Sequence, residues 1–227
     1  MINRRSFIIG IKSTKLNNKE INFLKKYKPW GIILFSRNLK SFHQIKKLTL
    51  EIKKLFKDKH YPILIDQEGG KVNRLNKIIS LNSFTSEYFG KLFINDRSKF
   101  NIIYKLFIDK TSDILTQLGI NINTVPVLDL YYKGSSSIIG NRSFSKNPNI
   151  VSKIGDLCIE FFTQNSIGTV IKHIPGHGLA KVDSHNFTPT IRKSLNFLKN
   201  NDFKTFRSKK SLFAMTAHLV FDKIDPI

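Results

Sequence analysis

The segment from Ile171 to His185, IKHIPGHGLAKVDSH, holds half of the six histidines of the chain. Its chemically capable side chains are Lys172, His173, His177, Asp183 and His185. An imidazole with a pKa near neutrality can donate and accept a proton in catalysis. Histidine and aspartate also bind metal ions, so a metal-dependent hydrolase that uses His173, His177, Asp183 and His185 stays an alternative, although their spacing matches no usual zinc pattern.

Short apolar runs rich in isoleucine and valine predict the strands that must position these side chains. The runs are residues 6–11, 31–35, 62–66, 122–130, 168–174 and 212–221. Their continuous hydrophobicity indicates strands that are covered on both faces, as in a parallel sheet. Segments with the helical repeat of apolar residues lie between them, at 18–27, 42–57, 100–119, 149–165 and 194–209.

The alternation of strands and helices predicts an α/β fold built from right-handed βαβ units. No GxGxxG motif follows the first expected strand. We therefore expect a (β/α) barrel of the TIM type, as a single domain over residues 1–227, rather than a dinucleotide-binding sheet.

Polar residues follow successive expected strands, which is where the active sites of barrels lie. FSRN follows the second run, DQEGGKVNR the third, DLYYKGSSSIIGNRSF the fourth and KHIPGHGLAKVDSH the fifth, and AHLVFDKID closes the sixth. Each group alone has a structural explanation: Asp66 can cap a helix, and Arg142 can pair with a surface acid. Their joint position at one end of neighbouring strands predicts a functional site there.

The composition restricts the class of protein. The formal net charge is +22, from 38 Lys and Arg against 16 Asp and Glu, but the lysines are scattered among Asn and Ile. We interpret the excess as a solvated surface and expect no nucleic-acid partner; a basic nucleic-acid or cell-wall-binding module is the weakest alternative. The single Cys158 lies in an apolar run and forms no internal disulfide, and Lys12 interrupts the apolar N-terminal run, so we expect a cytoplasmic protein without a membrane anchor.

Five segments of the chain, in order and approximate spacing, resemble the N-terminal barrel of glycoside hydrolase family 3. They are GIILFSRNL, ILIDQEGGKVNRL, IIGNRSFS, IKHIPGHGLAKVDSH and MTAHLVFDKIDP. The likeness is greatest to the bacterial β-N-acetylglucosaminidases of the NagZ type and runs over essentially the whole chain. It implies hydrolysis of terminal non-reducing N-acetyl-β-D-glucosamine, with retention and without a cofactor, on a carbohydrate partner such as a peptidoglycan fragment.

The resemblance also implies roles for single residues. His185, oriented by Asp183, would serve as the general acid/base in place of the usual second carboxyl group. The residues that would hold the sugar are Asp66, Arg74, Arg142, Lys172 and His173. His177 and His218 are as easily structural as functional. Gly176 and Gly178 are candidate hinges of the loop that carries the acid/base pair.

The chain departs from the family pattern at three places. Lys71 and Asn141 stand where arginine and aspartate are common. The nucleophilic aspartate of the family lies in an SDD-like segment downstream of DKIDP, which neither Asp222 nor Asp225 matches. We expect an incomplete barrel with about six of its eight strands, little or no turnover by this chain alone, and, as an alternative, a non-catalytic sugar-binding remnant. The oligomeric state is not predicted.

Overall fold

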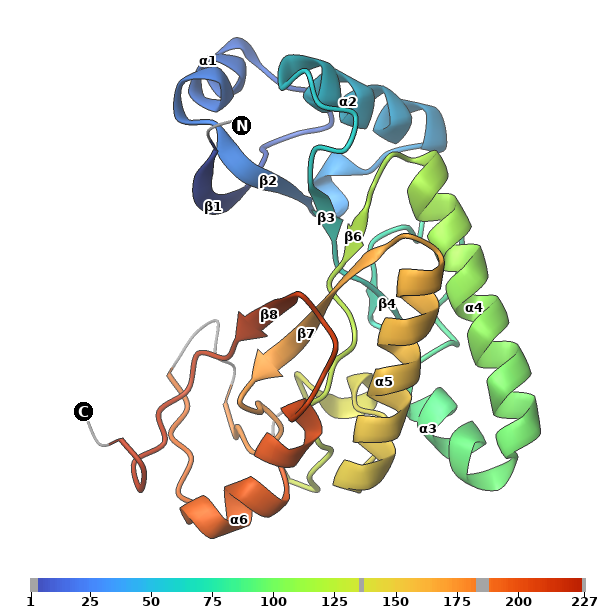
Figure 1. Cartoon of the computed structure of the whole chain (residues 1–227), viewed down its shortest axis with the longest axis vertical. Coiled ribbons are helices and arrows are strands. Elements are labelled where there is room, and N and C mark those ends of the chain that lie inside the picture. The colour runs from blue at the N-terminus through green and yellow to red at the C-terminus, as the bar shows by residue number, and fades with distance from the viewer. Residues whose placement is uncertain (1–3, 135–136, 183–187, 226–227) are drawn as a thin grey trace.

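The computed structural model describes residues 4–134, 137–182 and 188–225. Within these ranges a six-stranded parallel sheet has the order β1-β2-β3-β6-β7-β8. Its strands are β1 (Arg5–Gly10), β2 (Pro29–Leu34), β3 (Ile63–Ile65), β6 (Ile122–Asn123), β7 (Gly168–Ile174) and β8 (Phe213–Thr216). The strands follow one another across the sheet in chain order, which is the winding of a barrel, whereas a doubly wound sheet reverses its order. The α/β prediction and the incomplete barrel are confirmed: the curled sheet forms a half-barrel (Figure 1).

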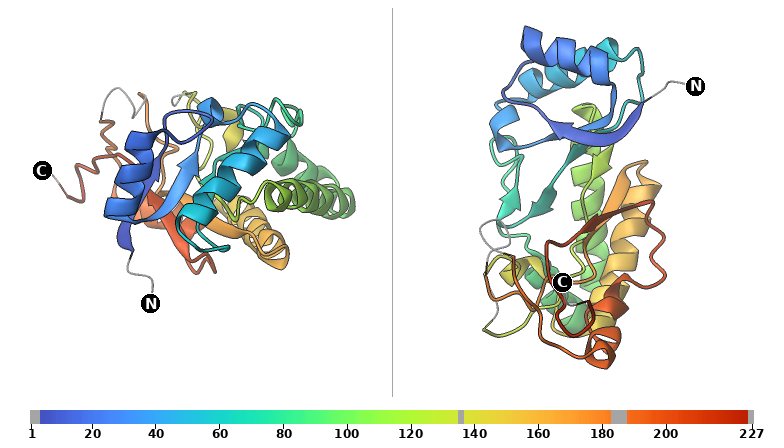
Figure 2. Two further views of the ribbon diagram at one scale, coloured as in Figure 1. Left: turned by 90° about the horizontal axis from the view of Figure 1, so that it is seen from above. Right: turned by 90° about the vertical axis from the view of Figure 1, so that its left-hand side faces the viewer.

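Helices connect the strands and cover the outside of the half-barrel. They are α1 (Asn18–Tyr27), α2 (Phe42–Leu55), α3 (Ser86–Asn95), α4 (Arg97–Gln117), α5 (Pro148–Gln164) and α6 (Leu195–Asn200), with the 3-10 turns η1 (Ser36–Asn38), η2 (Gly140–Arg142) and η3 (Phe203–Phe206). Helices α4 and α5 run side by side along one side of the sheet (Figures 1 and 2). Side chains cap the helices as sequence rules predict; Asn17 and Glu20, for example, form a capping box at α1.

Several elements of the structure differ from the predictions. The run 122–130 is a strand only at Ile122–Asn123, because Pro126 has no N–H to donate to a ladder, although Val127 still bridges to Lys172. The expected helix 194–209 is divided into α6 and η3. The hairpin β4 (Gln67–Gly69) and β5 (Val72–Asn73) and the helix α3 were not predicted.

The apolar core lies between the sheet and its helices. It is rich in isoleucine and leucine from β2, β3, α2, α4 and α5. No helix within the described ranges is long and apolar enough to cross a membrane. The pairing of β3 with β6 and of β6 with β7 holds these strands in fixed register. Asp66 and Arg74 follow β3, Lys172 and His173 lie on β7, and Arg142 lies on η2.

Candidate functional site

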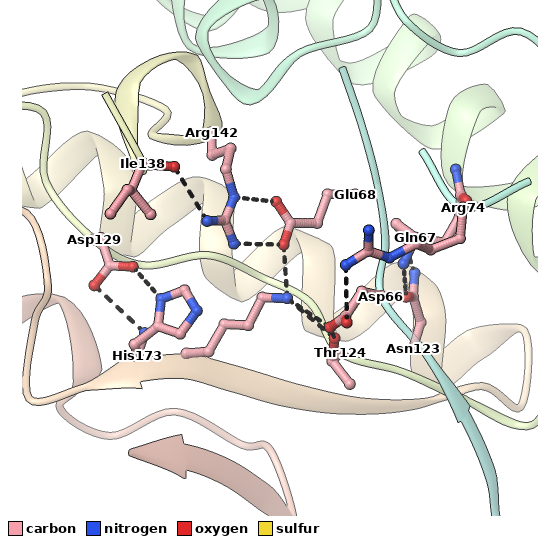
Figure 3. A network of polar contacts seen from close by, with 11 residues as sticks. Asp66, Gln67, Glu68, Arg74, Asn123, Thr124, Asp129, Ile138, Arg142 and His173 are labelled. Atoms are coloured by element: carbon pink, nitrogen blue, oxygen red, sulfur yellow. Dashed lines mark hydrogen bonds and ion pairs between the residues drawn. The ribbon is translucent and has the colours of Figure 1, made fainter. Parts of the chain in front are cut away.

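A buried lysine connects the ends of β3 and β7. Lys172 on β7 places its Nζ 3.1 Å from Oδ1 of Asp66, the residue that follows β3, and 2.6 Å from Oε1 of Glu68. The hydroxyl of Thr124 donates to Asp66 and accepts a hydrogen bond from Lys172 at 3.1 Å. Asp66 and Lys172, predicted separately from two motifs, therefore lie in one network (Figure 3).

Glu68 joins this network to Arg142. The guanidinium of Arg142 makes a bidentate pair with Glu68, with Nε–Oε2 and Nη2–Oε1 both 2.8 Å (Figure 3). Its Nη1 donates to the carbonyl of Ile138 at 3.2 Å. A bidentate pair fixes the plane of the guanidinium as well as its position. Glu68 was not among the predicted site residues, although it lies in the DQEGG motif two residues after Asp66.

Two hydrogen bonds between the side-chain amide of Asn123 and the backbone of Gln67 fix the position of this strand end. The Gln67 N–H donates to Oδ1 of Asn123, and Nδ2 of Asn123 donates to the Gln67 carbonyl, both at 2.9 Å. This pairing brings Asp66 and Glu68, on either side of Gln67, next to Thr124. Arg74 reaches the other oxygen of Asp66, with Nη2–Oδ2 at 3.5 Å, and it is the most exposed of the charged groups here.

The charges in the network keep its carboxyl groups ionised. Burial alone would raise the pKa of Asp66, but Lys172, Thr124 and Arg74 together lower it to about 2. The same balance holds the pKa of Glu68 below its ordinary value, because Lys172 and Arg142 outweigh burial. Burial opposes the charge of Arg142, and Glu68 more than offsets it, so the pKa of Arg142 is raised. The carboxylates and cations are thus preorganised before any ligand binds.

His173, next to Lys172, is oriented by a different carboxylate. Its Nδ1 lies 2.6 Å from Oδ2 of Asp129 (Figure 3). Oδ1 of Asp129 accepts from the backbone N–H of His177 at 2.7 Å. Burial would raise the pKa of Asp129, but His173 and the bond from His177 lower it. With Nδ1–H donating to a carboxylate, Nε2 is the nitrogen left for another partner. Asp129 was not predicted; its only signal was its place at the end of the run 122–130.

The network has a buried rear and a partly exposed front. The side chains of Lys172 and Glu68 are 1% and 3% exposed, whereas those of Asp66, Arg142 and His173 are 13%, 13% and 17% exposed. The rear pair holds the front groups in place, and the front groups present carboxylate, guanidinium and imidazole edges outward. Such groups bind hydroxyls through charge-assisted and bidentate hydrogen bonds.

The remaining predicted residues lie elsewhere or outside the described ranges. His177 is buried beneath this site, and burial is the main reason that its pKa is lowered. His218 follows β8 and is exposed. Asp183 and His185 lie outside the described residues, so the acid/base pair stays a prediction. Within the described ranges no group of three or more His, Cys, Asp or Glu could hold a metal ion.

Comparisons with known proteins find relatives over almost the whole chain. Residues 5–227 match the family described as the glycosyl hydrolase family 3 N terminal domain. The chain is 32% identical over 232 aligned residues to a beta-hexosaminidase of Neisseria meningitidis and 30% identical over 226 to one of Hydrogenovibrio crunogenus. These alignments include 99% and 97% of this chain, which spans 62% of the length of each relative.

A solved structure shares the fold over the same span. NagZ from Neisseria gonorrhoeae in complex with N-trifluoroacetyl-D-glucosamine superposes with a TM-score of 0.90 at 31% identity, covering 99% of this chain and 67% of that one. The match includes the segments that carry the Asp66, Arg142 and Lys172 network. The chain therefore belongs to glycoside hydrolase family 3, through the N-terminal domain of that family.

Proposed function

We propose that this chain holds the terminal non-reducing N-acetyl-β-D-glucosamine of a glycan for hydrolysis by a retaining glycosidase. The observation that carries the proposal is the network at the ends of β3 and β7, in which Lys172 and Glu68 hold Asp66 and Arg142 side by side. The relatives named as beta-hexosaminidases, and the relative bound to an N-acylated glucosamine, support this class of sugar. Peptidoglycan fragments are the proposed source, and the cytoplasm the proposed location.

Each front group has a role that its chemistry allows. The carboxylate of Asp66 accepts from two sugar hydroxyls, and Arg142 donates to ring substituents, while Nε2 of His173 bonds a further hydroxyl. Arg74, more exposed and 3.5 Å from Asp66, steadies that carboxylate from the open side. These roles follow from position in the network together with the family resemblance.

The proton transfer is assigned to Asp183 and His185 by the resemblance. An imidazolium protonates the leaving oxygen, and the neutral imidazole that results deprotonates the attacking water. A carboxylate stabilises the imidazolium form before the first step and after the second. Covalent retention also needs a carboxylate nucleophile. By the resemblance, the nucleophilic aspartate lies downstream of DKIDP, so we expect residues 1–227 tested by themselves to bind the sugar with little turnover.

Sugar binding tests the proposal directly. Titration calorimetry with N-acetylglucosamine compares the wild-type chain with Asp66→Asn, which keeps the shape of the side chain and removes its charge. We expect Asp66→Asn to weaken binding roughly tenfold to a hundredfold, the loss of one or two charge-assisted hydrogen bonds. Asp113→Asn makes the same change on the exposed side of α4 and serves as the matched control, with unchanged affinity.

Two results would contradict the proposal. One is a folded wild-type chain, by circular dichroism, that shows no saturable binding of the sugar. The other is an equal affinity of wild type and Asp66→Asn. Turnover of an aryl N-acetyl-β-glucosaminide at an ordinary enzymatic rate of about 10 per second would instead overturn only the expectation of low activity.

A further inference from the structure

Asp202 is a buried carboxyl group that the sugar-binding network does not use. It lies between α6 and η3 and is 1% exposed. Its Oδ2 accepts a hydrogen bond of 2.8 Å from the hydroxyl of Tyr132. Its Oδ1 is buried and has no hydrogen-bond partner within the described ranges. A buried carboxylate with one hydrogen bond is costly, so the surroundings favour the protonated form of Asp202.

This carboxyl group packs against the turn of residues 176–178, which leads away from β7. Gly176 has φ of +131°, and a Cβ there would lie 2.7 Å from Cβ and 3.2 Å from Oδ1 of Asp202. At Gly178, a Cβ would lie 2.1 Å from the carbonyl oxygen of Leu130. Both glycines therefore permit close backbone packing, a reason for glycine that is independent of the predicted hinge.

A second carboxylate holds the same turn from another side. Oδ1 of Asp129 accepts from the N–H of His177 at 2.7 Å, between the two glycines. The 176–178 turn is thus held at each of its three residues, by Asp202, by Asp129 and by the backbone at Leu130. The turn begins three residues beyond His173 and ends five residues before Asp183 in the chain.

The two carboxyl groups beside the turn have opposite protonation preferences. Burial raises the pKa of Asp202 to about 6; the bond from Tyr132 opposes this shift, and the negative charge of Asp129 adds to it. The pKa of Asp129 is lowered, because His173 and the bond from His177 outweigh burial. Within the described ranges, Tyr132 and Asp129 are the titratable groups that act on Asp202. Neutralising Asp202 thus removes a repulsion while Asp129 stays charged.

We propose that Asp202 is a proton-dependent positioning residue, which keeps the 176–178 turn packed while its carboxyl group is protonated and loosens the turn when that group ionises. An ionised Asp202 would be an underpaired buried charge, and movement of the turn would admit water to it. The loosening would reach His173 through Asp129 and would alter the course of the chain toward the proposed acid/base pair. The effect on the turn is independent of sugar binding; only its consequence for the site rests on the proposed function.

Amide NMR of the 227-residue chain, without sugar, tests this inference. The signals of Gly176 and Gly178 are followed from about pH 4.5 to pH 8 in wild type, Asp202→Asn and Tyr132→Phe. In wild type we expect both signals to titrate with a midpoint near 6. In Asp202→Asn that component is lost, whereas the component from the ring of His177 in the same turn remains. In Tyr132→Phe the midpoint moves to higher pH, because the hydrogen bond that favours the ionised form is gone.

Hydrogen exchange adds a readout that a purely structural role would not move. After correction for intrinsic exchange, opening at the Gly176 amide, which bonds to the His173 carbonyl at 2.8 Å, should rise about tenfold above the midpoint in wild type. The same rise should be absent in Asp202→Asn and present in Asp113→Asn, the matched surface control.

The possible results distinguish a failure of this inference from a failure of the proposed function. A wild-type chain without titration at Gly176 and Gly178, or a titration that is unchanged in Asp202→Asn, overturns the inference. If Asp202→Asn does not fold, Tyr132→Phe decides: an unchanged midpoint contradicts the inference. A chain that fails to bind N-acetylglucosamine but shows these titrations contradicts the proposed function alone.

Discussion

The loop after β2 and the site beyond β3 and β7 both carry polar residues at strand ends, yet they use them differently. In the first, Asn38 is fully buried; it donates to the carbonyls of Ile11 and Ser13 at 3.1 and 2.8 Å and accepts from the Phe35 N–H at 2.9 Å. Arg37 also donates to the Ile11 carbonyl. The FSRN motif, expected to contribute polar groups to the site, thus bonds to the backbone of its own loop and of the loop after β1.

In the second region the polar groups bond to one another's side chains. Lys172 lies between the carboxylates of Asp66 and Glu68, and Glu68 also binds Arg142. Such a cluster keeps unused donors and acceptors at its exposed front. The comparison teaches that a strand-end position does not by itself indicate function; a charged side-chain partner and an exposed edge do.

Removing the central cation should have the largest effect. Lys172→Met leaves two carboxylates buried together, and we expect a loss of about 3–5 kcal/mol of unfolding free energy together with weakened sugar binding. Lys209→Met is the matched control. The side chain of Lys209 is only 2% exposed, but that of its acidic partner Asp156 is 55% exposed. We therefore expect Lys209→Met to lower the unfolding free energy by about 1 kcal/mol or less. Urea unfolding measures both, and equal losses would show that Lys172 has no special place.

Removing the buried amide of the other region should have a smaller effect of a different kind. Asn38→Ala leaves the Phe35 N–H and the Ser13 carbonyl without their partner, at a cost of about 2–3 kcal/mol. Sugar affinity should not change, because Asn38 bonds to the backbone of the loops after β1 and β2 and not to the network at the site. Asn200→Ala, at an exposed amide on α6, is the control and should cost under about 0.5 kcal/mol. A large loss of affinity in Asn38→Ala would break the distinction between the two regions.

Lowering the pH should have the smallest of the three effects on the unfolding free energy. The pKa of Asp66 is lowered from 3.8 to about 2 on folding, so its stabilising contribution is complete above about pH 4 and is lost as the pH falls toward 2. The expected loss of unfolding free energy is about 2 kcal/mol. Unfolding free energies of wild type and Asn38→Ala should fall in parallel over this range. Asp66→Asn should fall less steeply, and an equal slope in all three would refute the assignment.

Much of the fold was predictable because the order and burial of the strands depend on local sequence patterns. Continuous apolar runs predicted the strands, and their alternation with helical segments predicted a barrel-type winding. Pro126 shortened one strand and the sequence 194–209 divided into α6 and η3, since tertiary packing decides where such segments end. Asp66, Arg142 and Lys172 were predicted from their motifs, and the structure places them in one network with Glu68 because parallel strands bring their carboxyl ends to one edge.

The sequence by itself determined the family, the order of the strands and the edge at which polar residues gather, since each depends on residue types at short spacing. Only the tertiary structure decided the partners. It placed Glu68 between Arg142 and Lys172, Asp129 against His173, and Asp202 against Gly176. The physical reason is that pairing and desolvation depend on distances through space, and these pairs join segments from distant parts of the chain.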